Sequence, residues 1–207
     1  MKNGIIAIYL AAGKSSRMGT NKLSLPLPTF TIGNSSLQTA LSSSLLEHVL
    51  VVTKKEDSLD WIDPSLFCFP YSSQWTHVVC DDAERGQAHS LKRGILAAMS
   101  ENPKGMMILL ADQPYLSRAT INELVTTYIN DSDQKDFVAA SYDGIPRPPV
   151  IFSPRVIPNL MKLQGDVGAR KLFHELEGIY VEFPYAQEFY DIDTKEDYER
   201  VIGGEWR

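Results

Sequence analysis

Apolar runs and amphipathic segments alternate along the first two thirds of the chain. Continuous apolar runs are typical of strands buried on both faces of a parallel sheet, and apolar residues three and four positions apart are typical of covering helices. The strands expected from such runs are residues 5–10, 49–52, 76–80 and 106–111. The expected helices are 34–46, which Asn34 or Ser35 would cap, 87–100, and one that Ser117 caps. This order predicts a doubly wound, mostly parallel α/β sheet sandwiched by helices.

The last third of the chain has a different texture. Short strands are expected over 137–142, 150–152 and 180–183, between loops rich in glycine and proline, with helices over 167–176 and 194–202. The sequence contains neither a repeat nor a linker. We therefore expect one domain over residues 1–207, in which a smaller lobe and closing helix (136–207) follow the main half (1–135).

Composition and charge narrow the class of protein. The 207 residues are 43% hydrophobic and 22% charged, which is ordinary for a globular protein. The net charge of −6 argues against nucleic-acid or anionic-membrane partners. No apolar run approaches the roughly 18–20 residues that cross a bilayer. The two cysteines, Cys68 and Cys80, lack CxxC spacing. We expect a cytoplasmic protein that binds neither nucleic acid nor membrane.

The loop after the first apolar run carries the strongest chemical signal. It reads Leu-Ala-Ala-Gly-Lys-Ser-Ser-Arg-Met-Gly over residues 10–19 and is soon followed by Lys22. Small residues allow backbone N–H groups to approach a ligand, and Arg17 and Lys22 add positive charge, a combination that suits a polyphosphate. A Walker A motif would need a glycine five positions before Gly13, where Ile8 stands. The sequence therefore predicts a phosphate loop of another kind.

Carboxylates follow other predicted elements. Asp112 ends the strand over 106–111, and Asp191 precedes the last helix, whose cap would be Asp193. Ligands bind open α/β sheets at the carboxyl ends of their strands, and proteins hold Mg²⁺ with one or two carboxylates and phosphate oxygens. For Asp112, a helix cap or a solvated turn is the structural alternative. A phosphate loop with paired acids predicts phosphoryl or nucleotidyl transfer.

The motifs together resemble a known family. The first loop resembles the phosphate-loop signature of the nucleotidyltransferases related to molybdenum cofactor guanylyltransferase. The resemblance continues at Gly86-Gln87, Ala111-Asp112-Gln113-Pro114, Gly165-Asp166-Val167-Gly168-Ala169-Arg170 and Asp191-Ile192-Asp193-Thr194. The whole set is most similar to molybdenum cofactor cytidylyltransferases and their purine-catabolism relatives that serve xanthine dehydrogenase. The turn over 144–149 departs from the family, because it lacks a second glycine.

The resemblance implies a fold, a reaction and a set of residues. The fold would be a Rossmann-like sheet of the nucleotide-diphospho-sugar-transferase type, with the nucleotide over residues 1–135 and the acceptor against the smaller lobe. Arg17, Lys22 and Asp112 would be catalytic, and Asp112 and Asp191 would hold Mg²⁺. The nucleotide would be bound by Leu10, Ala11, Ala12, Gly13, Ser15, Ser16, Arg17, Lys22, Asp81, Gly86, Gln87, Ser90 and Asp112. The acceptor would be bound by Gln113, Pro114, Gly165, Asp166, Gly168 and Arg170.

The implied reaction is transfer of CMP from CTP to the phosphate of a molybdopterin-type cofactor, for maturation of an apo molybdenum hydroxylase. Ala12 stands where guanylyl-transferring relatives carry a second glycine, which favours CTP over another nucleoside triphosphate. The alternatives are transfer from GTP, a sugar-phosphate acceptor, or a delivery factor without catalysis. For residues 165–170, a helix start could receive the acceptor phosphate, and the structural alternative is a helix that Asp166 caps, with Arg170 solvated.

Overall fold

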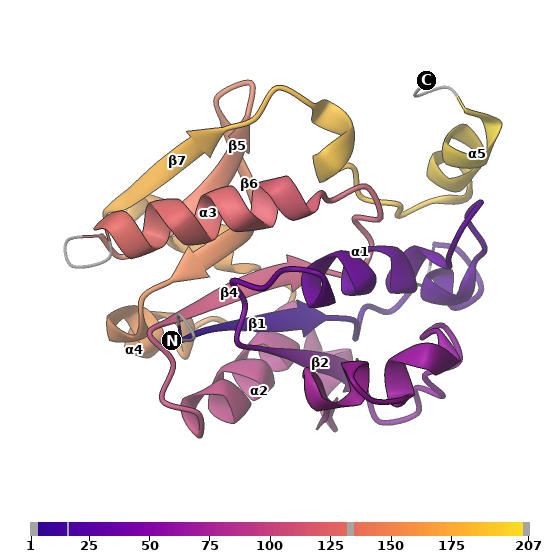
Figure 1. The fold of residues 1–207 in the computed structure, drawn as a ribbon, viewed down its shortest axis with the longest axis horizontal. Coiled ribbons are helices and arrows are strands. Elements are labelled where there is room, and N and C mark those ends of the chain that lie inside the picture. The colour runs from indigo at the N-terminus through magenta and orange to yellow at the C-terminus, as the bar shows by residue number, and fades with distance from the viewer. Residues whose placement is uncertain (1–3, 16, 132–134, 205–207) are drawn as a thin grey trace.

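Seven strands form one sheet in the computed structural model, which describes residues 4–15, 17–131 and 135–204 (Figure 1). Their order across the sheet is β3-β2-β1-β4-β6-β5-β7. The strands are β1 (Ile5–Leu10), β2 (His48–Lys54), β3 (Trp75–Cys80), β4 (Gly105–Leu110), β5 (Phe137–Tyr142), β6 (Ile145–Phe152) and β7 (Gly178–Glu182). β6 runs antiparallel to its neighbours β4 and β5, and the other pairs are parallel. The prediction of a mostly parallel sheet is confirmed.

Helices cover both faces of this sheet. The α-helices are α1 (Ile32–Leu41), α2 (Gln87–Met99), α3 (Arg118–Asp131), α4 (Ile157–Leu160) and α5 (Lys195–Gly203). Short 3₁₀ helices connect them: η1 (Lys22–Ser24), η2 (Pro64–Phe67), η3 (Tyr71–Ser73), η4 (Ala83–Arg85), η5 (Pro154–Val156), η6 (Ala169–His174) and η7 (Ala186–Phe189). α1, α3 and α5 contribute to the core on one face, and α2, α4 and η6 to the core on the other.

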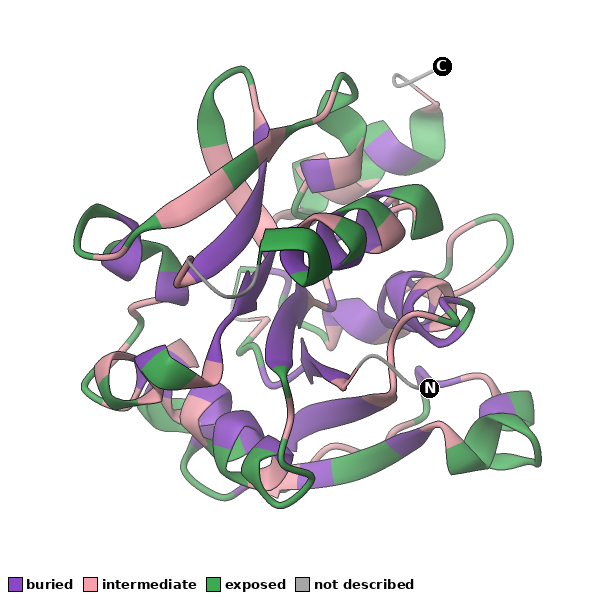
Figure 2. Ribbon diagram, turned by 60° about the vertical axis from the view of Figure 1, so that its left-hand side comes forward, coloured by how far each residue is buried: buried purple, intermediate pink, exposed green. Residues whose placement is uncertain are grey.

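The central strands are apolar in sequence because they are buried on both faces of the sheet. Every residue of β1 is buried, and successive side chains alternate between the two cores. Tyr9 enters the core with α1, where its hydroxyl donates to the Gly33 carbonyl oxygen, and Ile8 enters the core with α2. Figure 2 shows the buried strands between helices whose outer surfaces are exposed. The sheet is thus a rigid layer whose carboxyl edge can position loops.

Two predicted helices have different bounds in the structure. α1 begins at Ile32 because Thr31 is its cap, with Thr31 Oγ1 accepting from the Asn34 N–H at 3.3 Å. Asn34 instead accepts through its side chain from the Asp63 N–H. The helix predicted over 167–176 is the six-residue 3₁₀ helix η6, because the residues before it are held against α2.

The second lobe is built into the same sheet as the first half. β6 lies between β4 and β5, so a strand of the second lobe pairs directly with a strand of residues 1–135. Its proline-rich residues 145–149 were predicted as a loop, but most of them pair with β5, and only Val150–Phe152 pairs with β4. Prolines are tolerated there because they lie outside the doubly paired stretch.

None of the helices in the described part of the chain has the length and apolar character of a membrane span.

Candidate active site

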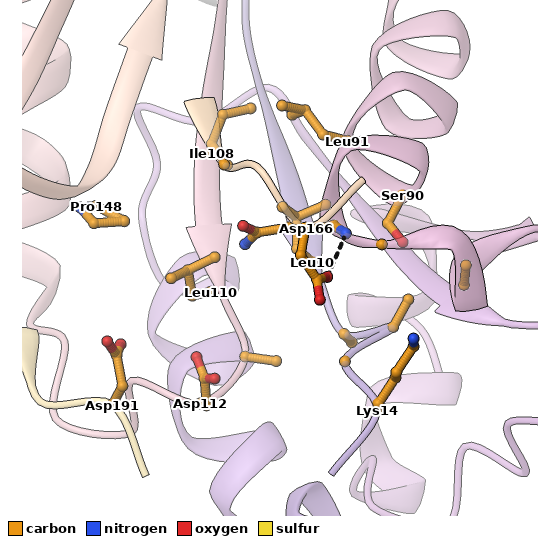
Figure 3. Close-up of a pocket in the computed structure, with 18 of the residues that line it drawn as sticks. Leu10, Lys14, Ser90, Leu91, Ile108, Leu110, Asp112, Pro148, Asp166 and Asp191 are labelled. Atoms are coloured by element: carbon orange, nitrogen blue, oxygen red, sulfur yellow. Dashed lines mark hydrogen bonds between the residues drawn. The ribbon is translucent and has the colours of Figure 1, made fainter. Parts of the chain in front are cut away.

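A cavity of about 580 Å³ opens at the carboxyl ends of β1 and β4 and draws its walls from both halves of the chain. Figure 3 shows Asp112 and Asp191 beside each other on one side of it, and Ser90 and Lys14 on the other. Fifteen of the predicted site residues line this cavity: Leu10, Ala11, Ala12, Gly13, Ser15, Arg17, Lys22, Gly86, Gln87, Ser90, Asp112, Asp166, Gly168, Arg170 and Asp191. Most of the predicted site is therefore brought together in one place.

The first loop leaves β1 with a fixed shape. The Ala11 N–H donates to the Val52 carbonyl oxygen at 2.8 Å, so the loop starts tied to β2. Ser15 turns the chain with a positive φ of 45°, and its side chain accepts from the Lys22 N–H at 3.3 Å. Met18 is buried and anchors the loop in between. Ser16, predicted to bind the nucleotide, lies outside the described residues.

Lys22 carries a buried positive charge at the centre of the site. Its side chain is 8% exposed, and Nζ donates to Asp112 Oδ2 at 2.7 Å and to Asp193 Oδ1 at 2.8 Å. Burial acts to lower the pKa of the ammonium, but the two carboxylates outweigh burial and raise the pKa above its ordinary value. Lys22 is thus charged at neutral pH and pulls the ends of β4 and of the segment before α5 together.

Asp193 belongs to the site and does not cap α5, which corrects the prediction. Its Oδ2 accepts from Arg17 Nη2 at 3.0 Å, so Asp193 binds both cations of the first loop. Burial acts to raise the pKa of Asp193, but Lys22 and Arg17 lower it below its ordinary value. The cap is Thr194, whose Oγ1 accepts from the Asp197 N–H at 3.1 Å. The reciprocal bond, from the Thr194 N–H to Asp197 Oδ2, completes a capping box.

Asp191 forms a second carboxylate next to Asp112. Its Oδ1 accepts from Gln113 Nε2 at 2.9 Å, and the Ile192 N–H donates to the Asp112 carbonyl oxygen at 3.0 Å. Partial removal from water, followed by the nearby charge of Asp112, raises the pKa of Asp191 to about 6. Two carboxylates that repel each other fit a hard cation such as Mg²⁺, which takes one or two carboxylates and completes its shell with phosphate oxygens and water. The described residues contain no cluster of three or more metal-ligating side chains.

Four predicted residues lie outside the cavity lining. Asp81 is exposed and pairs with Lys55 at 3.6 Å. Gln113 and Pro114 are buried behind the site, where Gln113 holds Asp191 and the Pro114 carbonyl oxygen accepts from the Ser35 hydroxyl. Gly165 accepts through its carbonyl oxygen from the Ala88 N–H at the start of α2. The structure therefore leaves these four out of the lining and gives them other partners.

Sequence reasoning missed several lining residues. Asp193, Lys14 and Lys171 add charge, and the apolar wall is formed by Leu23, Ala83, Leu91, Ile108, Leu110, Ala111, Pro148, Val150, Val167 and Ala169. Part of this wall could have been predicted from the sequence, because Ile108 and Leu110 are two residues apart in a strand and their side chains therefore share a face. The residues that β6 contributes could not be predicted from the sequence, since the position of β6 beside β4 follows from long-range pairing.

Comparisons with known proteins show the family to which the chain belongs. Residues 7–179 match the MobA-like NTP transferase domain. The chain is 44% identical over 201 residues to the purine catabolism protein PucB of Bacillus subtilis (strain 168), an alignment that covers 95% of each chain. The match to the domain takes in the first loop, Asp112 and the segment 165–170, and ends before Asp191 and Asp193.

Solved structures share the fold from end to end. A homologue of Mycobacterium tuberculosis Rv0371c from Mycobacterium sp. strain JC1 is 24% identical, with a TM-score of 0.80 over 98% of this chain and 97% of that one. Molybdopterin-guanine dinucleotide biosynthesis protein A of Archaeoglobus fulgidus is 15% identical, with a TM-score of 0.68 over 96% of this chain and 97% of that one. These likenesses place the sheet in the nucleotide-diphospho-sugar-transferase fold. The domain match and the 44% identity show that the chain belongs to the MobA-like NTP transferase family, whose members are nucleotidyltransferases.

Proposed function

We propose that this protein transfers CMP from CTP to the terminal phosphate of a molybdopterin-type cofactor and releases pyrophosphate. The observation that carries the proposal is the meeting of Arg17 and Lys22 with Asp112 and Asp191 in one cavity at the carboxyl edge of the sheet. Cations that bind a triphosphate, facing a carboxylate pair that fits Mg²⁺, are what nucleotidyl transfer requires. Delivery of the product to an apo molybdenum hydroxylase in the cytoplasm is the corresponding cellular proposal.

In this reaction an oxygen of the acceptor phosphate attacks the α-phosphorus of CTP. A new P–O bond forms, the bond from the α-phosphorus to the oxygen that bridges it to the β-phosphorus breaks, and pyrophosphate leaves with that oxygen. Arg17 and Lys22 bind triphosphate oxygens and neutralise the charge that develops on the leaving group. Asp112 and Asp191 would hold Mg²⁺, which when bound draws charge from the phosphate oxygens.

The proposed acceptor and the proposed preference for cytosine rest on different observations. PucB is named for purine catabolism, and the Archaeoglobus protein is named for molybdopterin-guanine dinucleotide biosynthesis, so relatives and neighbours support a molybdopterin acceptor. The preference for CTP rests on Ala12, which is buried and lines the cavity in the first loop. In this proposal, the Ala12 methyl group occupies space that a glycine would leave to a larger purine. A single methyl group discriminates by about 1–3 kcal/mol, so we expect a preference and not an absolute choice.

The proposal is tested by measuring thermal unfolding with CTP, GTP, ATP and UTP in the presence of Mg²⁺. A ligand at about 100 times its Kd stabilises the folded state by roughly 2.7 kcal/mol, so the donor gives a clear shift. The chosen nucleotide is then incubated with molybdopterin, and pyrophosphate is measured. We expect CTP to shift the transition most and pyrophosphate to appear only with both substrates. A larger shift with GTP would overturn the proposal that CTP is the donor. Release of pyrophosphate that does not depend on molybdopterin would overturn the proposed acceptor.

A further inference from the structure

The segment from Gly165 to Lys171, in the second lobe, lies directly against the first turn of α2. The Ala88 N–H donates to the Gly165 carbonyl oxygen at 3.1 Å. The Gln87 N–H donates to Asp166 Oδ1 at 3.3 Å, and this bond is the dashed line in Figure 3. Two N–H groups at the start of α2 thus have their partners 77 and 79 residues further along the chain.

The two segments approach so closely that their contact depends on a glycine. Gly86 has a φ of +118°, a conformation that other residues rarely adopt. A Cβ on Gly86 would lie 2.3 Å from the Gly165 carbonyl carbon and 2.6 Å from the Asp166 backbone nitrogen. Backbone therefore packs directly on backbone here.

α2 needs this contact because it has no cap of its own. Gly86 occupies the cap position and has no side chain to accept from the free N–H groups of the first turn. An aspartate is among the best caps, and normally it precedes its own helix in the chain. Here Asp166 supplies the carboxylate from the opposite lobe, and Gly165 supplies a carbonyl oxygen.

The contact joins two walls of the cavity. α2 contributes Gln87 and Ser90 to the side that we assign to the nucleotide. The segment that carries Asp166 contributes Gly168, Arg170 and Lys171 to the side that we assign to the acceptor. We propose that Asp166 is a positioning residue that caps α2 from the second lobe and fixes the spacing of the two walls, so that it sets the affinity for the nucleotide although it lies in the acceptor segment. This inference rests on the proposed function.

Asparagine and alanine at position 166 separate this role from a charge contact. Asparagine caps a helix about as well as aspartate but carries no charge, whereas alanine does not cap. For Asp166→Ala we expect the KM for CTP to rise about fivefold, which corresponds to the loss of a typical cap, with kcat much less affected. We expect Asp166→Asn to stay within about twofold of wild type. Asp131→Ala, an exposed aspartate at the end of α3, is the matched control.

Amide hydrogen exchange of the full-length protein without substrates gives a second readout. We expect faster exchange at Gln87 and Ala88 in Asp166→Ala, and wild-type exchange in Asp166→Asn and Asp131→Ala. Equal loss of activity in the asparagine and alanine variants would overturn the proposal in favour of a charge contact with substrate. Unchanged exchange and unchanged KM in Asp166→Ala would also overturn it. A wild-type protein that binds no nucleotide would overturn the proposed function itself and, with it, this role of Asp166, whatever the exchange shows.

Discussion

At the scale of single residues, the site is organised around one buried ammonium group. Lys22 Nζ is shared by Asp112 and Asp193, and Arg17 binds the other oxygen of Asp193. A buried charge is costly unless it is paired, so the carboxylates hold Lys22 in place before any nucleotide is present. In the proposed reaction, the triphosphate would then meet two cations whose positions are already set, which is how electrostatic preorganisation lowers a barrier.

Lys22→Ala should therefore lose most of its activity, by about 100-fold or more at saturating CTP. It should also lower the melting temperature at neutral pH, because Asp112 and Asp193 are left without their shared partner. Lys14→Ala is the control, because Lys14 lines the same cavity, is exposed, and forms no ion pair with the described residues. Steady-state rates and thermal unfolding of both variants check this. Similar losses in both would mean that general positive charge, and not the position of Lys22, matters.

Asp191 gives a prediction on pH. Its folded-state pKa of about 6 lies above the value of an unfolded chain, so the native state binds the proton more tightly. The stability that comes from this group is present below about pH 4 and is lost as the pH rises through 6. At pH 8 without divalent cations, Asp191→Asn should be as stable as wild type or more stable, by at most about 1 kcal/mol because solvent screens this exposed residue. At pH 4 we expect little difference.

Activity and stability should separate in this variant. Asp191→Asn keeps an oxygen for Gln113 but loses the charge that holds a hard cation, so Mg²⁺-dependent turnover should fall strongly. Asp112→Asn should lose turnover as well, and should also lose stability because it faces Lys22. Melting curves in EDTA at both pH values, with rates in Mg²⁺, test the pair. A drop in melting temperature for Asp191→Asn at pH 8 would contradict the argument.

At the scale of elements, the sequence predicts those strands and helices whose position depends on local hydrophobic periodicity. Predicting β1, β4 and α2 from their apolar residues needed no long-range information. Arg17 and Lys22 could be predicted as site residues because their loop directly follows β1. The errors arose where a distant segment competes for a polar group. Asn34 bonds Asp63 and is not a cap, Asp193 bonds Lys22 and is not a cap, and the turn before η6 bonds α2.

The capping box of α5 supports the site from behind. Asp197 Oδ2 accepts from the backbone N–H groups of both Asp193 and Thr194, so the same box that starts the helix also fixes Asp193. Thr194→Ala should destabilise the protein by about 1 kcal/mol and raise the KM for the nucleotide, whereas Thr194→Ser should be close to wild type. Denaturant unfolding and nucleotide titrations measure both effects. A stability loss with no change in KM would limit the box to a role in folding.

η6 changes the expectation for the acceptor. It is a six-residue 3₁₀ helix and not the longer α-helix predicted, so its backbone offers little to a phosphate, and the exposed Arg170 side chain becomes the group that we expect to act. Arg170→Ala should raise the KM for molybdopterin and leave CTP binding unchanged. This result would contrast with Asp166→Ala, where CTP binding weakens. Weaker CTP binding in Arg170→Ala would remove the distinction between the two walls.

At the scale of the molecule, the two halves share one sheet and one site. β6 pairs with β4, Lys22 Nζ donates to Asp193, and the Tyr198 hydroxyl donates to the Pro26 carbonyl oxygen at 2.7 Å. The two halves are thus joined within the sheet and also by side-chain contacts outside it. Sequence patterning predicted a single domain because it found no linker. The interleaving of β6 gives a stronger physical reason, since removing either half would leave a central strand, β4 or β6, paired on one side only.

This interleaving predicts that the chain unfolds in one cooperative step, which two probes can test. Trp61 and Trp75 are buried in the first half, and replacing Trp206, which lies outside the described residues, by phenylalanine leaves fluorescence as a probe of that half alone. Far-UV circular dichroism reports on helices of the whole chain. In urea the two transitions of Trp206→Phe should coincide, and CTP should move both midpoints equally. A fluorescence transition that precedes the dichroism change would show that residues 136–207 keep their structure after the first half unfolds, and the single-domain prediction would then be wrong.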